Sequence, residues 1–157
     1  MRRRHPALPT RWLLTDERMG DALWDALRRL PPGSGVIVRH YGFPSQDRAA
    51  LLRRVRRLGA ARGLVVWDDK CARVARVHSG RELRRALLRS PRLLFLSPLF
   101  PTRTHPDWPA LPWMRAAALR RLSPRPVLAL GGMNEKRFRR AKTLGFGGYG
   151  AIDGWLD

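Results

Sequence analysis

Cysteine is nearly absent from this chain of 157 residues: Cys71 is the only one, so no disulfide can form within the chain. No apolar run approaches the roughly 20 residues that a membrane-spanning helix needs. The basic start, residues 1–5, leads into prolines and not into an apolar signal core, which argues against secretion. We therefore expect a cytoplasmic protein that makes no contact with a membrane.

Acidic residues are also scarce: 12 Asp and Glu oppose 32 Lys and Arg, which gives a net charge of +20. This excess has three explanations: a coding bias that fills solvated helix faces with arginine, attraction of small anionic substrates, or neutralisation of nucleic-acid phosphates. The arginines occur in helical runs such as 53–57 and are not interleaved with aromatic residues, as a base-stacking surface requires. We therefore favour a phosphorylated small molecule over nucleic acid as the partner.

Short β-type runs alternate with amphipathic helical runs along the whole chain. Seven runs are typical of buried strands, namely 11–15, 36–41, 64–67, 73–78, 93–96, 127–130 and 148–152. Asp16, Ser79 and Asn134 are expected to be helix N-caps. This alternation predicts an α/β domain over residues 1–157, with a parallel sheet and a flexible segment at residues 1–10. Ligands of such sheets bind at the carboxyl ends of the strands.

Three segments in the second half have the residues of an anion site. Residues 97–106 (SPLFPTRTHP) place Thr102 and Thr104 on either side of an arginine, so hydroxyl and guanidinium donors lie together. Gly131 and Gly132 stand between a strand and a helix, where exposed backbone N–H groups commonly hold phosphate. Residues 147–152 (GGYGAI) lead into the last strand. Each segment alone also fits an ordinary tight turn.

In this order the three segments resemble the thiamine phosphate synthase and thiazole tautomerase superfamily. The segment 97–106 is the most specific, being similar to a family loop usually written GPxFPTxTK, and LALGGM and GYGAID are similar to the two strands that follow it. The resemblance implies a TIM-type (βα) barrel. It also implies that thiazole phosphate is bound by Thr102, Thr104, Gly131, Gly132, Ala151 and Ile152. Asp153 stands where the family has a phosphate-contacting serine.

The chain is short for such a barrel, which usually takes about 250 residues. The family's fourth strand, with its second metal-binding aspartate, is missing after Asp69. We therefore expect a parallel barrel of the TIM type, shortened to about seven βα units. An incomplete barrel has open edges that must be covered. A homo-oligomer could cover this gap.

The resemblance implies two reactions. The synthase joins a pyrimidine pyrophosphate to thiazole phosphate with Mg²⁺, and this chain keeps Arg39 of the family's basic motif and Asp68 of its metal motif, with Tyr41 in place of a lysine. The tautomerase moves a proton on the thiazole ring with a histidine in a Val-His-Ser context, the place of His78. We therefore name His78 and Arg39 as catalytic candidates and Asp68 as the Mg²⁺ ligand.

The residues themselves leave other roles open. His78 could equally be an ordinary residue at a strand end, before an N-cap. Asp68 could be an acidic residue of a turn with no role in metal binding. The expected function is therefore thiamine phosphate synthesis, with two alternatives: thiazole phosphate tautomerisation, and a non-catalytic relic that binds a phosphorylated ligand.

Overall fold

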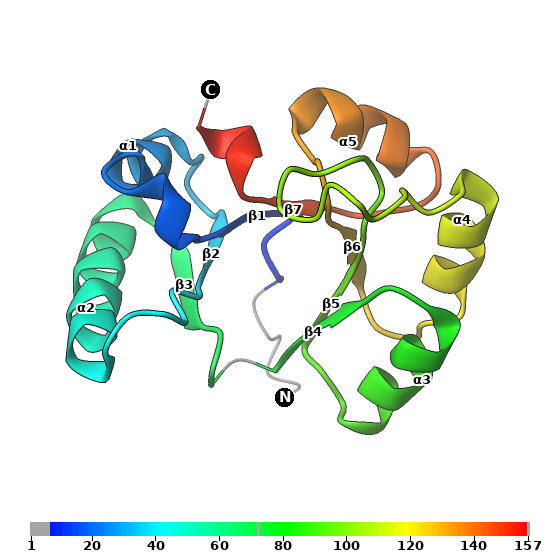
Figure 1. The fold of residues 1–157 in the computed structure, drawn as a ribbon, viewed down its shortest axis with the longest axis horizontal. Coiled ribbons are helices and arrows are strands. Elements are labelled where there is room, and N and C mark those ends of the chain that lie inside the picture. The colour runs from blue at the N-terminus through cyan, green and yellow to red at the C-terminus, as the bar shows by residue number, and fades with distance from the viewer. Residues whose placement is uncertain (1–6, 72, 157) are drawn as a thin grey trace, which may run out of the picture.

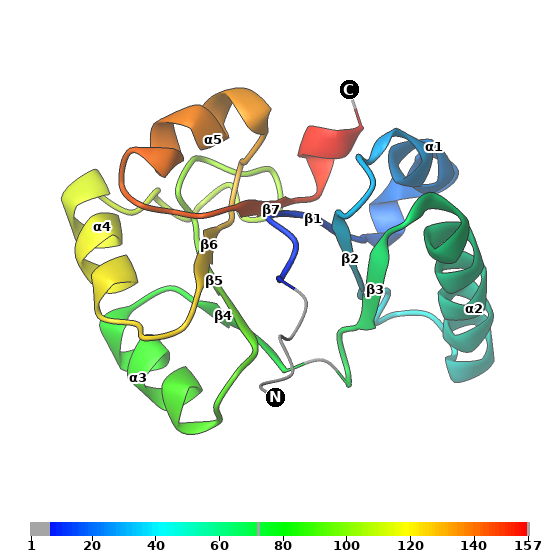
Figure 2. The ribbon, with the colours of Figure 1, turned by 180° about the vertical axis from the view of Figure 1, so that it is seen from behind.

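The computed structural model describes residues 7–71 and 73–156. In this part of the chain, seven parallel strands form one curled sheet with helices on its outer face (Figures 1 and 2). The strands are β1 (Arg11–Leu14), β2 (Gly35–Val38), β3 (Val65–Asp68), β4 (Val74–Val77), β5 (Leu93–Leu96), β6 (Val127–Ala129) and β7 (Tyr149–Ala151). The helices are α1 (Ala22–Arg29), α2 (Ser45–Arg62), α3 (Gly80–Leu88), α4 (Trp113–Arg121) and α5 (Glu135–Lys142), with 3-10 turns η1 (Glu17–Met19) and η2 (Asp153–Trp155). The prediction of seven strands in a parallel sheet is confirmed.

The sheet is a barrel from which one unit is missing. Its strand order is β3-β2-β1-β7-β6-β5-β4, so the first strand pairs with the last, as in a closed barrel. Within the described residues, β3 and β4 each have one neighbouring strand, and no helix lies in residues 69–71 and 73, between them. A complete TIM barrel has eight strands. The missing unit therefore lies between β3 and β4, and the predicted shortened TIM-type barrel is confirmed.

Large side chains fill the interior of the curled sheet. Trp12 on β1 is fully buried, its ring centroid lies 4.8 Å from that of Trp67, and its Nε1–H donates to the Pro9 carbonyl at 2.7 Å. Glycine on the neighbouring strand makes room for this ring, because a Cβ on Gly35 would lie 2.2 Å from Trp12 Cε3. The interior is thus a packed core up to the level of the cavity described below.

The predicted caps are present where the helices begin. The side chains of Asp16, Ser79 and Asn134 accept hydrogen bonds from the backbone N–H groups of Arg18, Glu82 and Arg137 at 3.0, 3.2 and 2.8 Å. The helical run expected after Asp16 is divided into η1 and α1. The division falls at Gly20, whose φ of 50° interrupts the helical backbone.

The first ten residues, expected to be flexible, fall only partly in the described structure. Residues 1–6 lie outside it. The carbonyl groups of Pro9 and Thr10 accept hydrogen bonds from Trp12 and Tyr149 at 2.7 and 2.8 Å. No helix in residues 7–71 and 73–156 has the length and apolar character to cross a membrane.

Candidate functional site

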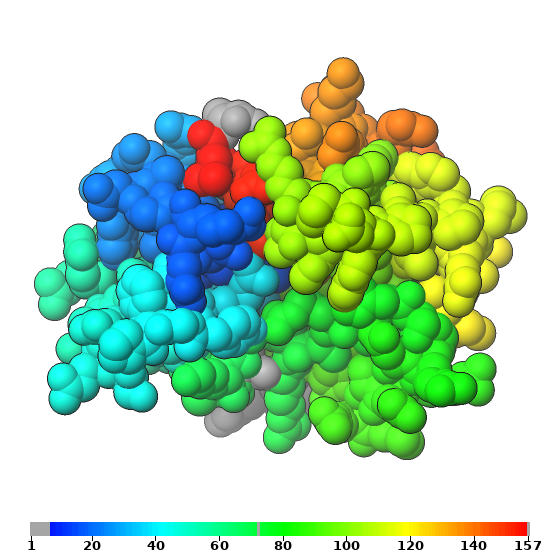
Figure 3. Space-filling view, in the orientation of Figure 1, coloured from blue at the N-terminus to red at the C-terminus, as the bar shows by residue number. Residues whose placement is uncertain are grey.

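A cavity of about 480 Å³ opens at the carboxyl ends of the strands. Its wall contains residues at or directly after the ends of six of the seven strands, including Leu14, Arg39, His78, Ser97 and Ile152. The loop after β5 covers this end of the sheet, and Figure 3 shows it beside the segment around η1. The cavity is therefore where a TIM-type barrel places its ligand.

Two glycines with left-handed backbone form the centre of a cradle of backbone N–H donors, a candidate anion site. Gly131 and Gly132 have φ values of 90° and 59°, a region that side chains disfavour. A Cβ on Gly131 would lie 2.6 Å from Pro98 Cα, and one on Gly132 would lie 2.3 Å from the Pro101 carbonyl oxygen. Among the described residues, the N–H groups of Gly131, Gly132 and Met133 donate to no backbone acceptor. These donors lie at the start of α5 and are free to hold a phosphate.

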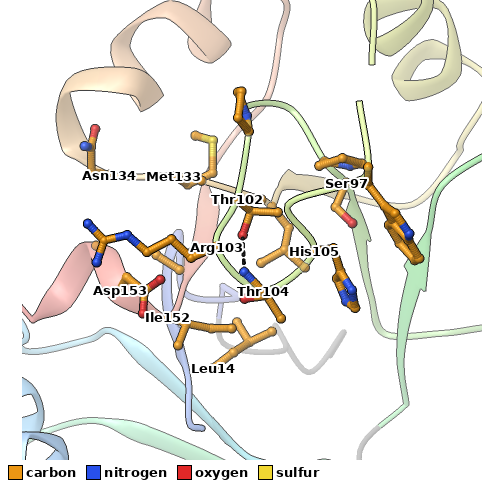
Figure 4. Close-up of a pocket in the computed structure, with 18 of the residues that line it drawn as sticks. Leu14, Ser97, Thr102, Arg103, Thr104, His105, Met133, Asn134, Ile152 and Asp153 are labelled. Atoms are coloured by element: carbon orange, nitrogen blue, oxygen red, sulfur yellow. Dashed lines mark hydrogen bonds between the residues drawn. The ribbon is translucent and has the colours of Figure 1, made fainter. Parts of the chain in front are cut away.

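The loop after β5 brings the two predicted threonines to this cradle. Its backbone lies beside the segment that follows β6, since Leu99 N–H and Phe100 N–H donate to the carbonyl groups of Leu130 and Gly131 at 3.0 and 3.2 Å. Thr102 and Thr104 both line the cavity, and Thr104 N–H donates to the Thr102 hydroxyl at 3.3 Å. In Figure 4 this loop faces the segments that carry Asn134 and Asp153.

The end of β7 completes the same wall. Ala151 and Ile152 line the cavity, as does Asp153 in the turn η2. Arg137 on α5 adds a cation beside them, its Nη1–H donating to the Gly132 carbonyl at 2.5 Å. The structure thus brings together all six residues expected to bind the substrate: Thr102, Thr104, Gly131, Gly132, Ala151 and Ile152.

His78 lies on the cavity wall with one ring nitrogen held by a carboxylate. Its Nδ1 lies 2.8 Å from Oε2 of Glu82, which also accepts a hydrogen bond from the His78 backbone N–H at 2.9 Å. Burial raises the pKa of Glu82, but the hydrogen bonds from His78 outweigh it and bring the pKa below its usual value. The His78 ring meets Trp108 edge-on, with the centroids 5.0 Å apart. When Nδ1 donates to Glu82, Nε2 carries the lone pair of a general base.

Arg39 directly follows β2, lines the cavity and is hydrogen-bonded to residues at the end of β1. Its Nε–H donates to the Thr15 carbonyl at 2.8 Å and its Nη2–H to Asp16 at 3.1 Å. Burial lowers the pKa of Arg39, although Asp16 opposes the shift. The guanidinium remains charged at any physiological pH and can contact an anion.

Asp68 faces away from the cavity toward α2. Its carboxylate accepts a hydrogen bond from Arg48 Nη2 at 2.5 Å, and the two side chains are 12% and 7% exposed. The neighbouring Asp69 forms an ion pair with Arg76. Within residues 7–71 and 73–156, no three His, Cys, Asp or Glu side chains gather as a metal site. These donors do not fit Mg²⁺, which takes several oxygen ligands, so the metal role of Asp68 stays a prediction that the geometry does not support.

Asp68→Asn is expected to lower the free energy of unfolding by about 3 kcal/mol at neutral pH, because it leaves the Arg48 guanidinium buried without a counter-charge. The hydrogen bond from Arg48 is the main cause that lowers the pKa of Asp68. The stabilisation is therefore complete above about pH 4, the pKa of an unfolded Asp, and is lost as the pH falls through the lowered value.

Urea unfolding of both proteins at pH 7 and pH 3 measures this effect, and the difference between them should be smaller at pH 3. Asp25→Asn is the matched control, since it removes an exposed pair with Arg28, worth less than about 1 kcal/mol. Unchanged stability of the Asp68→Asn protein, combined with loss of Mg²⁺-dependent ligand binding, would contradict this structural role.

Three residues of the site were not predicted from the sequence. Arg76 precedes His78 by two residues, so strand alternation could have placed both on the cavity wall. Arg137 occupies the third position of a capped helix behind the glycine pair, where a cation can reach an anion on the cradle. Glu82 lies three residues after the N-cap Ser79, which is the spacing of a capping box. No local pattern indicates its contact with the ring of His78.

Comparison with known proteins identifies the fold and the family. The chain is similar to a solved structure of thiamine phosphate pyrophosphorylase from Pyrococcus furiosus, with a TM-score of 0.76 and 17% identity, over 93% of this chain and 86% of that one. At this identity the likeness shows the fold alone. No curated protein matches the sequence. The sequence model for thiamine monophosphate synthase matches residues 74–154, just over half of the chain, and so the chain belongs to the thiamine monophosphate synthase family.

Proposed function

We propose that this protein acts in thiamine biosynthesis on thiazole phosphate, and that His78 moves a proton on the bound ring. One observation carries the proposal: His78, whose Nδ1 lies 2.8 Å from the Glu82 carboxylate, lines the same cavity as the glycine cradle. A carboxylate that fixes one nitrogen of an imidazole leaves the other ready to accept and return a proton. The cradle supplies the matching phosphate site.

The geometry supports a division of work among the residues. The N–H groups near Gly131 and Gly132 and the hydroxyls of Thr102 and Thr104 hold the phosphate and so orient the ring. The neutral His78 ring then takes a proton from one position of the heterocycle and returns one to another, so no proton is consumed. Trp108 provides an aromatic surface at the same wall.

A second candidate is the synthase reaction, which joins a pyrimidine pyrophosphate to thiazole phosphate. The positions of Arg39 and Arg76 favour it, because both line the cavity from strands other than those of the cradle. Two guanidinium groups can hold a diphosphate and stabilise it as it leaves. A third candidate is a non-catalytic relic of the family, which binds thiazole phosphate without converting it. This function requires only the glycine cradle.

Calorimetric titration and proton exchange distinguish these functions. We expect thiazole phosphate to bind without Mg²⁺ and its tautomers to interconvert, as followed by NMR. Binding of the pyrimidine pyrophosphate and formation of thiamine phosphate would favour the synthase. Binding without any turnover would favour the relic, and no binding of thiazole phosphate would overturn the proposal.

Glu82→Gln is expected to slow the tautomer conversion by about 10-fold or more, because the imidazole loses the carboxylate that orients it and stabilises its charged form. The Kd for thiazole phosphate should stay within about twofold, since the cradle is intact. NMR exchange rates and calorimetry on the same samples measure both quantities. An equal loss of affinity and turnover would indicate that Glu82 acts only by holding the backbone that precedes α3.

A further inference from the structure

Three side chains from the two sides of the open edge form one hydrogen-bonded cluster. The guanidinium of Arg76 on β4 donates to both carboxylate oxygens of Asp69, which follows β3, at 2.8 and 3.1 Å. It also donates to the hydroxyl of Tyr41, which lies beyond the end of β2, at 3.0 Å. The Tyr41 hydroxyl in turn donates to Asp69.

The cluster lies between two strands that are not joined by backbone hydrogen bonds. In the described structure, β3 pairs with β2 and β4 pairs with β5, but β3 and β4 do not pair with each other. The side chain of Asp69 is 8% exposed and that of Arg76 is 30% exposed, so water screens this two-pronged ion pair only in part. A further contact joins the same two sides of the edge, where the Arg92 guanidinium lies 4.9 Å from the Trp67 ring centroid.

Asp69 is ionised within this cluster. Burial raises its pKa, but the hydrogen bonds from Arg76 and Tyr41 outweigh burial and bring the pKa below its usual value. The contact across the edge is therefore a charged one. Neutralising the carboxylate would leave Arg76 with weaker partners at a site where no backbone hydrogen bond can compensate.

Arg76 also belongs to the cavity wall, together with Arg39 and His78. Asp69 and Tyr41 take three of its five N–H groups, which leaves Nε–H and one Nη1–H for a ligand. Its charge is close enough to Arg39 to contribute to the lowered pKa of that residue. Two cations thus share one part of the wall, and neither belongs to the glycine cradle.

We propose that the Tyr41–Asp69–Arg76 cluster takes the place of the missing βα unit: it ties β3 to β4 and holds Arg76 on the cavity wall, where it contacts an anionic group of the ligand without a metal ion. Asp69 and Tyr41 are positioning residues, and Arg76 makes the contact. The tie between the strands is independent of any proposed function, whereas the ligand contact rests on the second candidate function, in which a diphosphate binds outside the glycine cradle.

Hydrogen exchange of backbone amides tests the tie. Asp69→Asn should speed exchange in β3 and β4 by about 10-fold or more, while the central strands β1 and β7 keep their protection. Tyr41→Phe should act in the same direction with a smaller change, and it removes only one hydroxyl, so it remains informative if the Asp69 variant folds poorly. Asp25→Asn is the control. Unchanged protection of the edge strands in both variants, or an equal loss over all strands, overturns the tie.

Calorimetry with inorganic pyrophosphate in the presence of EDTA tests the ligand contact. Arg76→Gln should weaken pyrophosphate binding by about 10-fold or more. Arg76→Lys should weaken it by less, because lysine keeps the positive charge and loses only the paired N–H donors of the guanidinium. Asp69→Asn should also weaken it, since Arg76 is no longer held. Binding that needs Mg²⁺, or that is unchanged in Arg76→Gln, overturns the contact. Thiazole phosphate is titrated in parallel, and its failure to bind the unmodified protein overturns the proposed function and not the tie.

Discussion

Glutamine in place of His78 is expected to lower the rate of thiazole phosphate tautomer conversion by about 10²–10⁴-fold, the usual contribution of a positioned acid–base group. A carboxamide is neither a general acid nor a general base near neutral pH, whereas an imidazole can act as either. The Kd for thiazole phosphate should change by no more than about twofold, because a loss confined to the chemical step lowers kcat and leaves binding intact. Single-turnover NMR gives the rate and calorimetry gives the Kd.

His105→Gln is the matched control for this variant. The His105 ring stacks on Trp108 with the centroids 4.3 Å apart, so it lies beside the same indole as His78 and in the same cavity. No carboxylate contact fixes its nitrogens in the described residues. Its replacement should cost much less turnover than that of His78. Equal losses in the two variants would show that a general effect on the loop, and not proton transfer by His78, limits the reaction.

The seven strands were predictable because each is a short apolar or β-branched run with a turn signal after it. The strands β5 and β6 were predicted at residues 93–96 and 127–130. Both are buried on both faces, which matches the continuous apolar pattern of parallel strands. The cradle was predictable for a similar reason. Two adjacent glycines between a strand and an N-cap permit the left-handed backbone that other residues disfavour, and Gly131 and Gly132 adopt it.

Contacts between side chains from distant segments were not predictable in the same way. Asp68 was predicted to bind Mg²⁺ because it stands at the place of the family's metal motif, yet its partner Arg48 lies 20 residues earlier on α2. Strand alternation indicates a face and not a partner. Glu82 illustrates the same limit, since a capping-box glutamate ordinarily bonds the N-cap backbone, but here it turns to His78, the residue before the cap.

The packing of Trp12 against Gly35 leads to the largest expected effect on stability. Trp12→Ala should lower the free energy of unfolding by about 4 kcal/mol, because it removes a fully buried ring and leaves a cavity inside the shortened barrel. Gly35→Ala alone should cost about 1–3 kcal/mol or more, because its Cβ would overlap the indole. Urea unfolding with a constant m-value measures both changes.

The double variant decides whether the two losses have one cause. If Gly35 is there to admit the indole, a methyl group at position 35 is harmless once the ring is gone and even fills part of the space. The double variant should then be more stable than the sum of the single losses by about 1 kcal/mol or more, a favourable coupling between residues in contact. Gly147→Ala is the control, because a Cβ there meets no atom within 4 Å, and it should add to Trp12→Ala without coupling. Strict additivity of Trp12→Ala and Gly35→Ala would mean that Gly35 serves the backbone of β2 instead, and that the interior of this shortened barrel is not shaped around one tryptophan.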